Sequence, residues 1–462
     1  MEALSPKQTP TQINLTKKFI FILFGLASLL GWNAIMSELP FFSFYLQKMD
    51  PATSFPFLNY ALNIVLQFLM LYNRNLVPLK FRVIGGLISG IIIMIVLPVI
   101  VLNLEKNSTL NVIITGALIL IMGMINALCS GGFFALVSFF PTNLMIAFSA
   151  GQGFSGVMMN IIQYVVLGFV NSENKQNDLN KTAWIYFGIS AGILFLVLIL
   201  LIFELKSDFF KYYLKPLDIR LKEENENENN ESDNYKKNEK KITTEIDTQF
   251  YLKEDEDKNL IDNHEGEIQK ENSILFIDDP TPKKRREISF LEMFKILMDL
   301  DLLRTYINFI SNTLFPKAGV TQSLFSLNKY KTVTILIIYN LTDFFGRYIV
   351  LAFKQTKLKT YIISLGRTVL VFLLIFNYYC EISLKININI TSILLIIWVV
   401  ALGLTDGIGN SLCFGLAPTM VEDELKLQAG SSMSFFTVLG LFLGSCLAFL
   451  TKYILEQIDK KK

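Results

Sequence analysis

Long apolar runs constrain this chain more than any other feature of its sequence. A helix needs about 20 consecutive apolar residues to cross the hydrocarbon core of a bilayer. Because the backbone finds no water there, only helices and closed β-barrels can span it. We therefore predict an all-α integral membrane protein with about eleven transmembrane helices, six before a polar segment and five after it. The runs are Phe19–Leu46, Ser54–Tyr72, Val83–Leu102, Leu110–Phe140, Leu144–Val170, Ala183–Leu205, Leu302–Leu327, Thr332–Phe353, Thr360–Tyr379, Ile393–Phe414 and Gln428–Leu455.

The polar segment between the two groups of runs is acidic. From Ser207 to Phe290 it carries 15 Lys and Arg against 22 Asp and Glu, whereas the complete chain has a net charge of +2. A segment this polar cannot bury enough apolar surface to offset its ordering entropy. We expect five parts: a cytoplasmic N-terminus at 1–18, helices at 19–205, a disordered acidic cytoplasmic loop at 206–290, helices at 291–456, and a short C-terminal tail at 457–462.

The placement of Lys and Arg predicts the orientation, because short cytoplasmic loops carry an excess of these residues. Lys17 and Lys18 directly precede the first run and favour a cytoplasmic N-terminus. Three N-x-S/T sequons, at Asn107, Asn180 and Asn389, then fall in loops on the opposite side. An odd number of spans places the C-terminus on the extracellular or luminal side. We expect the plasma membrane, with an internal membrane as the alternative.

Catalytic and metal-binding constellations are missing from the sequence. The only histidine, His264, lies in the acidic segment, and the four cysteines lie within or beside apolar runs without the spacing of a zinc site or a disulfide framework. A membrane enzyme needs a nucleophile, an acid–base pair or a metal. We therefore predict a protein that is not an enzyme, has no cofactor and no metal, binds no nucleic acid, and is surrounded by the lipid bilayer.

Three polar residues share one face of the run Thr332–Phe353. Asn340, Asp343 and Arg347 are spaced three and four apart, which places them on one side of a helix. Ionisable side chains inside a span are costly and usually face a cavity or a partner. An Asp–Arg pair offers a carboxylate acceptor and a planar five-donor guanidinium, the groups needed to hold adjacent ribose hydroxyls. The alternative is a structural ion pair that holds helices together.

A tryptophan and an asparagine lie near the centre of the first run. Trp32 is unusual there, because tryptophans in membrane proteins prefer the interfaces. Together with Asn33 it offers a stacking surface and an amide at the middle of the membrane. Core packing is the alternative. Gly151, Gly153 and Gly156 in the fifth run indicate close helix contacts of the small-xxx-small kind.

At these residues the chain resembles the equilibrative nucleoside transporter family. Five segments resemble family motifs in the family's order: "GLASLLGWN", "VPLKFRV", "SAGQGFSG", "NLTDFFGR" and "QAGSSMSFFTVLGLFLGS". The resemblance implies a major-facilitator-like fold, a nucleoside or nucleobase substrate, and alternating access by rocking of two bundles. It also implies a central site in which Asp343 and Arg347 bind the ribose and apolar or aromatic residues enclose the base. The residues at the implied site are Leu29, Trp32, Asn33, Met36, Ser130, Phe315, Asn340, Asp343, Arg347 and Leu441.

Two positions depart from the family pattern. Ser130 stands where many members have a glutamine that hydrogen-bonds the base, and serine lacks the paired donor and acceptor of an amide. Asp406 stands where the family usually has asparagine, beside glycines that would loosen the helix. Without a cation partner, a buried carboxyl is a candidate to carry protons as a co-substrate. Arg367 is a candidate partner, and a structural role through hydrogen bonds is the alternative.

A second transporter class explains part of the pattern. A facilitator-type carrier of another polar metabolite, such as a sugar or a pteridine, fits the number of spans. It does not account for the combination of Trp32–Asn33 with Asp343–Arg347. The nucleoside and nucleobase interpretation therefore explains more of the sequence.

Overall fold

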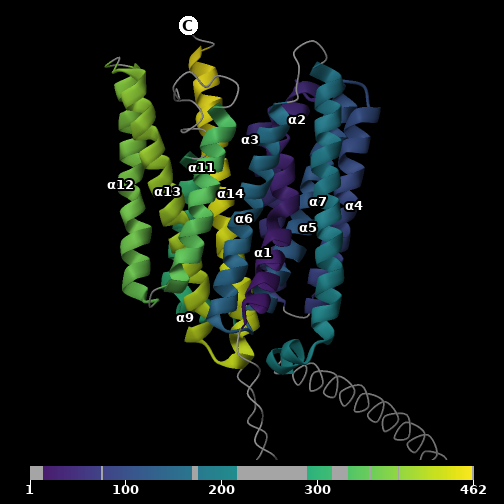
Figure 1. Ribbon diagram of the computed structural model, residues 1–462, viewed down its shortest axis with the longest axis vertical. Helices are drawn as coiled ribbons and strands as arrows, with labels where there is room; N and C mark the ends of the chain where they lie inside the picture. Colours follow the sequence, from purple (N-terminus) through teal and green to yellow (C-terminus); the bar gives the residue numbers. More distant parts are fainter. Residues whose placement is uncertain are drawn as a thin grey trace, which may run out of the picture. The chain divides into compact units, whose positions relative to one another are not determined.

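The computed structural model describes residues 14–73, 76–168, 175–215, 289–314, 331–352, 355–382, 384 and 386–459, and these contain helices and no strands. This confirms the predicted all-α class. Figure 1 shows the long helices running roughly along a common direction. Most of the predicted acidic loop (residues 216–288) lies outside the described residues, and its disorder stays a prediction. The helices are α1 (Leu15–Ser37), α2 (Leu39–Tyr45), α3 (Pro51–Tyr72), α4 (Leu79–Asn103), α5 (Thr109–Val137), α6 (Thr142–Leu167), α7 (Lys175–Lys206), α9 (Phe290–Leu314), α11 (Lys331–Ile349), α12 (Lys357–Ile382), α13 (Ile388–Leu416) and α14 (Lys426–Asp459).

Ten helices within the described ranges are long and apolar enough to cross a membrane. The remaining long helix, α9, has 25 residues but is the most polar, because Asp301 and Arg304 follow three further charged residues near its start. The predicted run Leu302–Leu327 placed the start of this helix too late, since the helix begins at Phe290. Hydropathy misses the first turns of α9 because their charged side chains make them polar, although Asp301 and Arg304 are buried inside the bundle.

The first predicted run is divided in the structure. Instead of one helix over Phe19–Leu46, α1 ends at Ser37 and α2 begins at Leu39, with Glu38 outside the helical region at φ −95° and ψ 21°. Pro40 is the cause, because proline has no N–H to donate and its ring clashes with the preceding turn. Proline is well tolerated in the first turn of a helix, where Pro40 lies in α2.

The described helices form two groups that contact each other along a few helix pairs. In the first group α1 packs on α6 and α4 on α5, and in the second group α11 packs on α13 and α9 on α14. The groups meet where α6 contacts α11 and where α14 contacts α3 and α5. These shared surfaces bring the polar residues of α11 and α13 close to those of α6.

Glycines permit the closest of these helix contacts. A Cβ added at Gly151 of α6 would lie 2.0 Å from the carbonyl oxygen of Ile22 in α1, and one at Gly407 of α13 would lie 2.1 Å from the carbonyl oxygen of Asp343 in α11. The predicted packing role therefore agrees with the geometry at Gly151. The expectation that glycines loosen the helix around Asp406 is wrong, because α13 is helical throughout Ile388–Leu416.

We expect Gly151→Ala to destabilise the protein, because the methyl group has no room against the backbone of α1. Overpacking of this kind costs about 1–3 kcal/mol. Gly188→Ala on α7 is the matched control, since nothing lies within 4 Å of a Cβ added there. Thermal unfolding of the purified variants in detergent tests the comparison. Equal midpoints for the two variants would contradict the close contact.

Candidate functional site

A cavity of about 260 Å³ lies between the two helix groups. Its walls come from α1, α3, α5 and α6 of the first group and from α9, α11, α13 and α14 of the second. The volume lies just below the range of about 300–1,000 Å³ typical of small-molecule sites. Side-chain amides make up much of the lining: Asn33, Asn59, Asn63, Asn126, Gln152, Asn308, Asn312, Asn340 and Asn410.

Most of the site residues suggested by the sequence line this cavity. Met36, on α1 and partly buried, does not line it, and Phe315 lies outside the described residues. Residues from distant parts of the sequence are thus brought together around one small space. The predicted residues in the lining are Leu29, Trp32, Asn33, Ser130, Asn340, Asp343, Arg347, Asp406 and Leu441.

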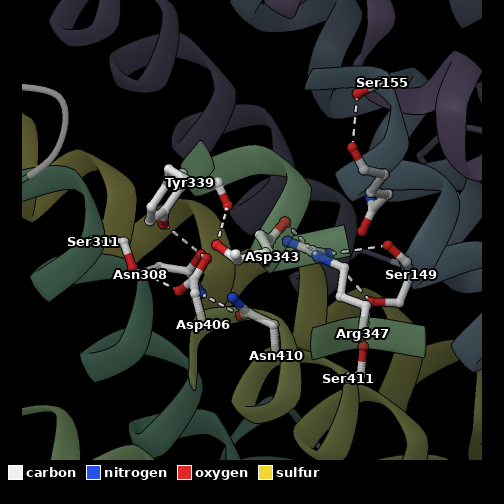
Figure 2. Close-up of polar contacts among 12 residues, drawn as sticks. Ser149, Ser155, Asn308, Ser311, Tyr339, Asp343, Arg347, Asp406, Asn410 and Ser411 are labelled. Carbon is white, nitrogen blue, oxygen red and sulfur yellow. Dashed lines mark hydrogen bonds and ion pairs between the residues drawn. The ribbon is translucent and has the colours of Figure 1, made fainter. Parts of the chain in front are cut away.

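The ion pair predicted on one helical face is present in α11. Arg347 donates from Nε to Oδ2 of Asp343 at 2.9 Å, and both side chains are buried. The Nη1 group of Arg347 reaches α6, where it donates to the backbone oxygen and the hydroxyl of Ser149, each at 3.2 Å. Figure 2 shows this chain of contacts. Oδ1 of Asp343 has no hydrogen-bond partner among the described residues, so the cavity contains a buried acceptor that a ligand hydroxyl can satisfy.

Asp406 has the cation partner that sequence alone left undecided. Arg367 of α12 donates from Nη1 to Oδ1 of Asp406 at 2.5 Å. Ser311 donates to the same oxygen at 2.6 Å, and the Tyr339 hydroxyl donates to Oδ2 at 3.1 Å (Figure 2). These donors stabilise the ionised carboxylate. The condition under which Asp406 was a candidate proton carrier, namely a carboxyl without a cation, is therefore not met.

The aromatic part of the site comes from the first helix group. Trp32 is buried on α1, and its ring centroid lies 5.7 Å from that of Tyr60 on α3. Asn33 donates to the hydroxyl of Ser155 on α6 at 2.6 Å. Both aromatic rings line the cavity. The geometry places a stacking surface on the side of the cavity formed by α1 and α3.

Among the lining residues that sequence reasoning missed are two sets that each lie along a single helix. Asn59 and Asn63 lie on one face of α3, and Asn126 of α5 donates to Asn59 at 2.9 Å. Their spacing of four was readable in the run Ser54–Tyr72, but an amide is a weaker signal than a charge.

The second missed set lies on α9. Arg304, Asn308 and Asn312 follow each other at the same spacing of four and also line the cavity. The predicted run began at Leu302 and therefore put Arg304 near the start of its span. A charged residue at the edge of a span is common and does not indicate a binding site.

Comparison with known proteins places the chain among transporters. Residues 116–453 match the family model for nucleoside transporters. The chain is 21% identical to human equilibrative nucleoside transporter 1 in an alignment of length 480, which covers 94% of this chain and 96% of that protein. It is 23% identical to mouse equilibrative nucleoside transporter 2, with the same coverage of each chain. A match to Arabidopsis thaliana equilibrative nucleotide transporter 1 has 24% identity and covers 42% of this chain and 43% of that one.

Solved structures show the same fold at low sequence identity. The major facilitator superfamily proton:xylose symporter XylE aligns with a TM-score of 0.58 at 14% identity, covering 96% of this chain and 89% of the symporter. A bacterial homologue of the iron transporter ferroportin aligns with a TM-score of 0.51 at 9% identity, covering 94% and 92%. The predicted major-facilitator-like architecture is confirmed.

We expect Arg367→Met to be strongly destabilising, because it leaves the Asp406 carboxylate buried without its cation. Breaking one side of a buried ion pair costs about 3–5 kcal/mol. The double variant Arg367→Met/Asp406→Leu removes both charges and should recover much of the loss. Thermal unfolding of the purified single and double variants provides the measurement. A double variant no more stable than Arg367→Met would show that the pair does not account for the cost.

Proposed function

Because the chain belongs to the nucleoside transporter family, we propose that it carries nucleosides or nucleobases across a membrane. The observation that carries the proposal is the buried, unsatisfied Oδ1 of Asp343 beside Arg347 in a cavity between two helix groups. A carboxylate and a guanidinium on one helical face suit adjacent hydroxyls, which donate to the first and accept from the second. In this proposal Asp343 and Arg347 hold the ribose.

The base then occupies the aromatic side of the cavity. Trp32 supplies a stacking surface, while Leu29 and Leu441 provide apolar walls on opposite helix groups. Asn33, Ser130 and Asn340 add polar groups to the lining. Because Ser130 is shorter than the family's glutamine, it reaches less far toward a base. The nearby amides Asn59, Asn63 and Asn126 provide the paired donors and acceptors that Ser130 lacks.

Alternating access is the proposed mechanism. The cavity is lined by both helix groups, so rocking of one group against the other opens it to each side of the membrane in turn. The multi-pass chain is proposed to lie in the plasma membrane, with its N-terminus cytoplasmic and its C-terminus outside. The basic residues Lys17 and Lys18 before α1 support this orientation.

Transport should be measured with the purified protein in lipid vesicles. We expect uptake of labelled uridine or adenosine that unlabelled nucleosides inhibit and glucose does not. Arg347→Lys should lose most of this uptake, because lysine keeps the charge and loses the planar guanidinium. We expect the apparent affinity for the nucleoside to fall about tenfold or more. Lys357→Arg is the matched control, since Lys357 forms a half-exposed ion pair with Asp299. Glucose uptake without nucleoside uptake would overturn the proposal.

Proton coupling through Asp406 is not part of the proposed mechanism, because Arg367 already neutralises this carboxylate. We expect vesicles containing the parent protein to equilibrate nucleoside without concentrating it when a proton gradient is imposed. The pH profiles of the parent and Asp406→Asn should have the same shape, whatever the change in rate. Accumulation in the parent that disappears in Asp406→Asn would assign the proton to Asp406.

A further inference from the structure

Arg304 is a buried arginine whose guanidinium is only partly satisfied by the protein. It lies on α9, is 1% exposed and lines the cavity. Its Nε donates to the hydroxyl of Thr437 on α14 at 2.6 Å, and its Nη1 donates to the backbone oxygen of Asn410 on α13. Its Nη2 makes no hydrogen bond to any residue in the described part of the chain. A donor group therefore remains available to whatever occupies the cavity.

The other buried charges at the cavity are already paired. Asp343 pairs with Arg347, and Asp406 pairs with Arg367. Within the described ranges, no carboxylate forms an ion pair with Arg304. Asp301, one turn earlier on α9, accepts instead from the hydroxyl of Ser432 and does not line the cavity. Arg304 thus lines the ligand space without an ion-pair partner among the described carboxylates.

A fixed geometry makes this donor selective. The two hydrogen bonds to α13 and α14 hold the guanidinium, and its carbon lies 5.3 Å from the ring centroid of Phe134, which also lines the cavity. An arginine held in this way can only donate, because it has no acceptor atom. A ligand group facing Arg304 must therefore be an acceptor, and a donor at that position would leave both groups unsatisfied.

The size of the cavity favours a neutral acceptor over a phosphate. Its volume of about 260 Å³ is small for a nucleotide. A carbonyl oxygen brings an acceptor and no net charge.

Resting on the proposed function, we propose that Arg304 is a specificity-determining residue. It selects bases with a keto group at C6 of a purine or C4 of a pyrimidine over bases with an amino group at that position. The Nη2 donor pairs with a ring carbonyl, such as that of hypoxanthine, guanine or uracil. The exocyclic amino groups of adenine and cytosine present a donor in the same place. Inosine and adenosine differ at C6 and in the adjacent N1 proton, and uridine and cytidine differ at C4 and in the adjacent N3 proton. Each pair therefore exchanges a carbonyl acceptor for an amino donor on this edge of the base.

Initial uptake rates by vesicles containing the purified parent protein test the proposal first. We expect inosine to exceed adenosine, and uridine to exceed cytidine, by about tenfold or more in transport efficiency. Nucleoside uptake without this preference would overturn the proposal for Arg304 and leave the proposed function intact. No uptake of any nucleoside would instead overturn the proposed function. If inosine monophosphate inhibited uptake more strongly than inosine, Arg304 would be assigned to an anion. That result would overturn the proposal of a neutral acceptor.

The variant Arg304→Met then assigns the preference to this residue. It should reduce inosine uptake about tenfold while adenosine uptake changes by no more than a fewfold, so that the two efficiencies become similar. Lys357→Met is the matched control, because it removes an exposed cation far less buried than Arg304 and should keep the preference. An unchanged inosine-to-adenosine ratio in Arg304→Met would contradict the assignment. If Arg304→Met is poorly folded, Thr437→Val replaces it, because this variant removes one contact that positions Arg304. It should weaken the preference, and an unchanged preference would contradict the assignment.

Discussion

Buried charges between membrane helices must be satisfied by the protein, and this requirement organises the described part of the bundle. Asp343 with Arg347 and Asp406 with Arg367 are nearly inaccessible to solvent. A charge left unpaired in such surroundings is costly, whereas a well-bonded pair recovers much of its desolvation cost. The hydroxyls of Ser311 and Tyr339 bind the carboxylate of Asp406 and complete its surroundings. The positions of α9, α11, α12 and α13 are thus tied to a common polar cluster.

Small residues make this polar cluster possible. A Cβ at Gly153 of α6 would lie 2.9 Å from Oδ2 of Asp343, and one at Gly156 would lie 2.9 Å from the side chain of Asn340. Gly403 and Gly407 of α13 permit the same close approach from the other side of α11. Without these glycines α11 would stand farther from both neighbours. Arg347 would then lose its short reach to Ser149.

The architecture was readable from the sequence because its signals are local. Apolar runs set the helices, and the spacing of Asp343 and Arg347 within one run required them to share a face. The division at Pro40 and the early start of α9 were missed. In the first case an apolar run continued across the proline, and in the second the first turns are charged.

The partners of these residues were less accessible, because they depend on contacts between helices far apart in the chain. Arg367 was identified as a candidate for Asp406, yet only the packing of α12 on α13 brings their side chains to 2.5 Å. The contacts of Arg304 were inaccessible for the same reason. Its contacts with Thr437 and Asn410 lie more than 100 positions away along the sequence. Hydropathy and spacing describe one helix at a time and carry no information on such pairs.

The distribution of these contacts between the two helix groups bears on how the proposed rocking motion is tolerated. Among the described residues, each ion pair lies within a single group: Lys17 and Glu204 are both in the first, and the pairs of Asp343 and Asp406 are both in the second. The polar contacts that cross at the site are weaker, namely Arg347 with Ser149 and Ser149 with the hydroxyl of Ser411. Separating the groups therefore breaks hydrogen bonds to neutral partners and leaves the buried charges paired. Breaking a buried pair costs about 3–5 kcal/mol, whereas a hydrogen bond donated by a charged group is worth about 1.5–3 kcal/mol. The proposed rocking motion therefore costs less in this arrangement than one that separated the ion pairs.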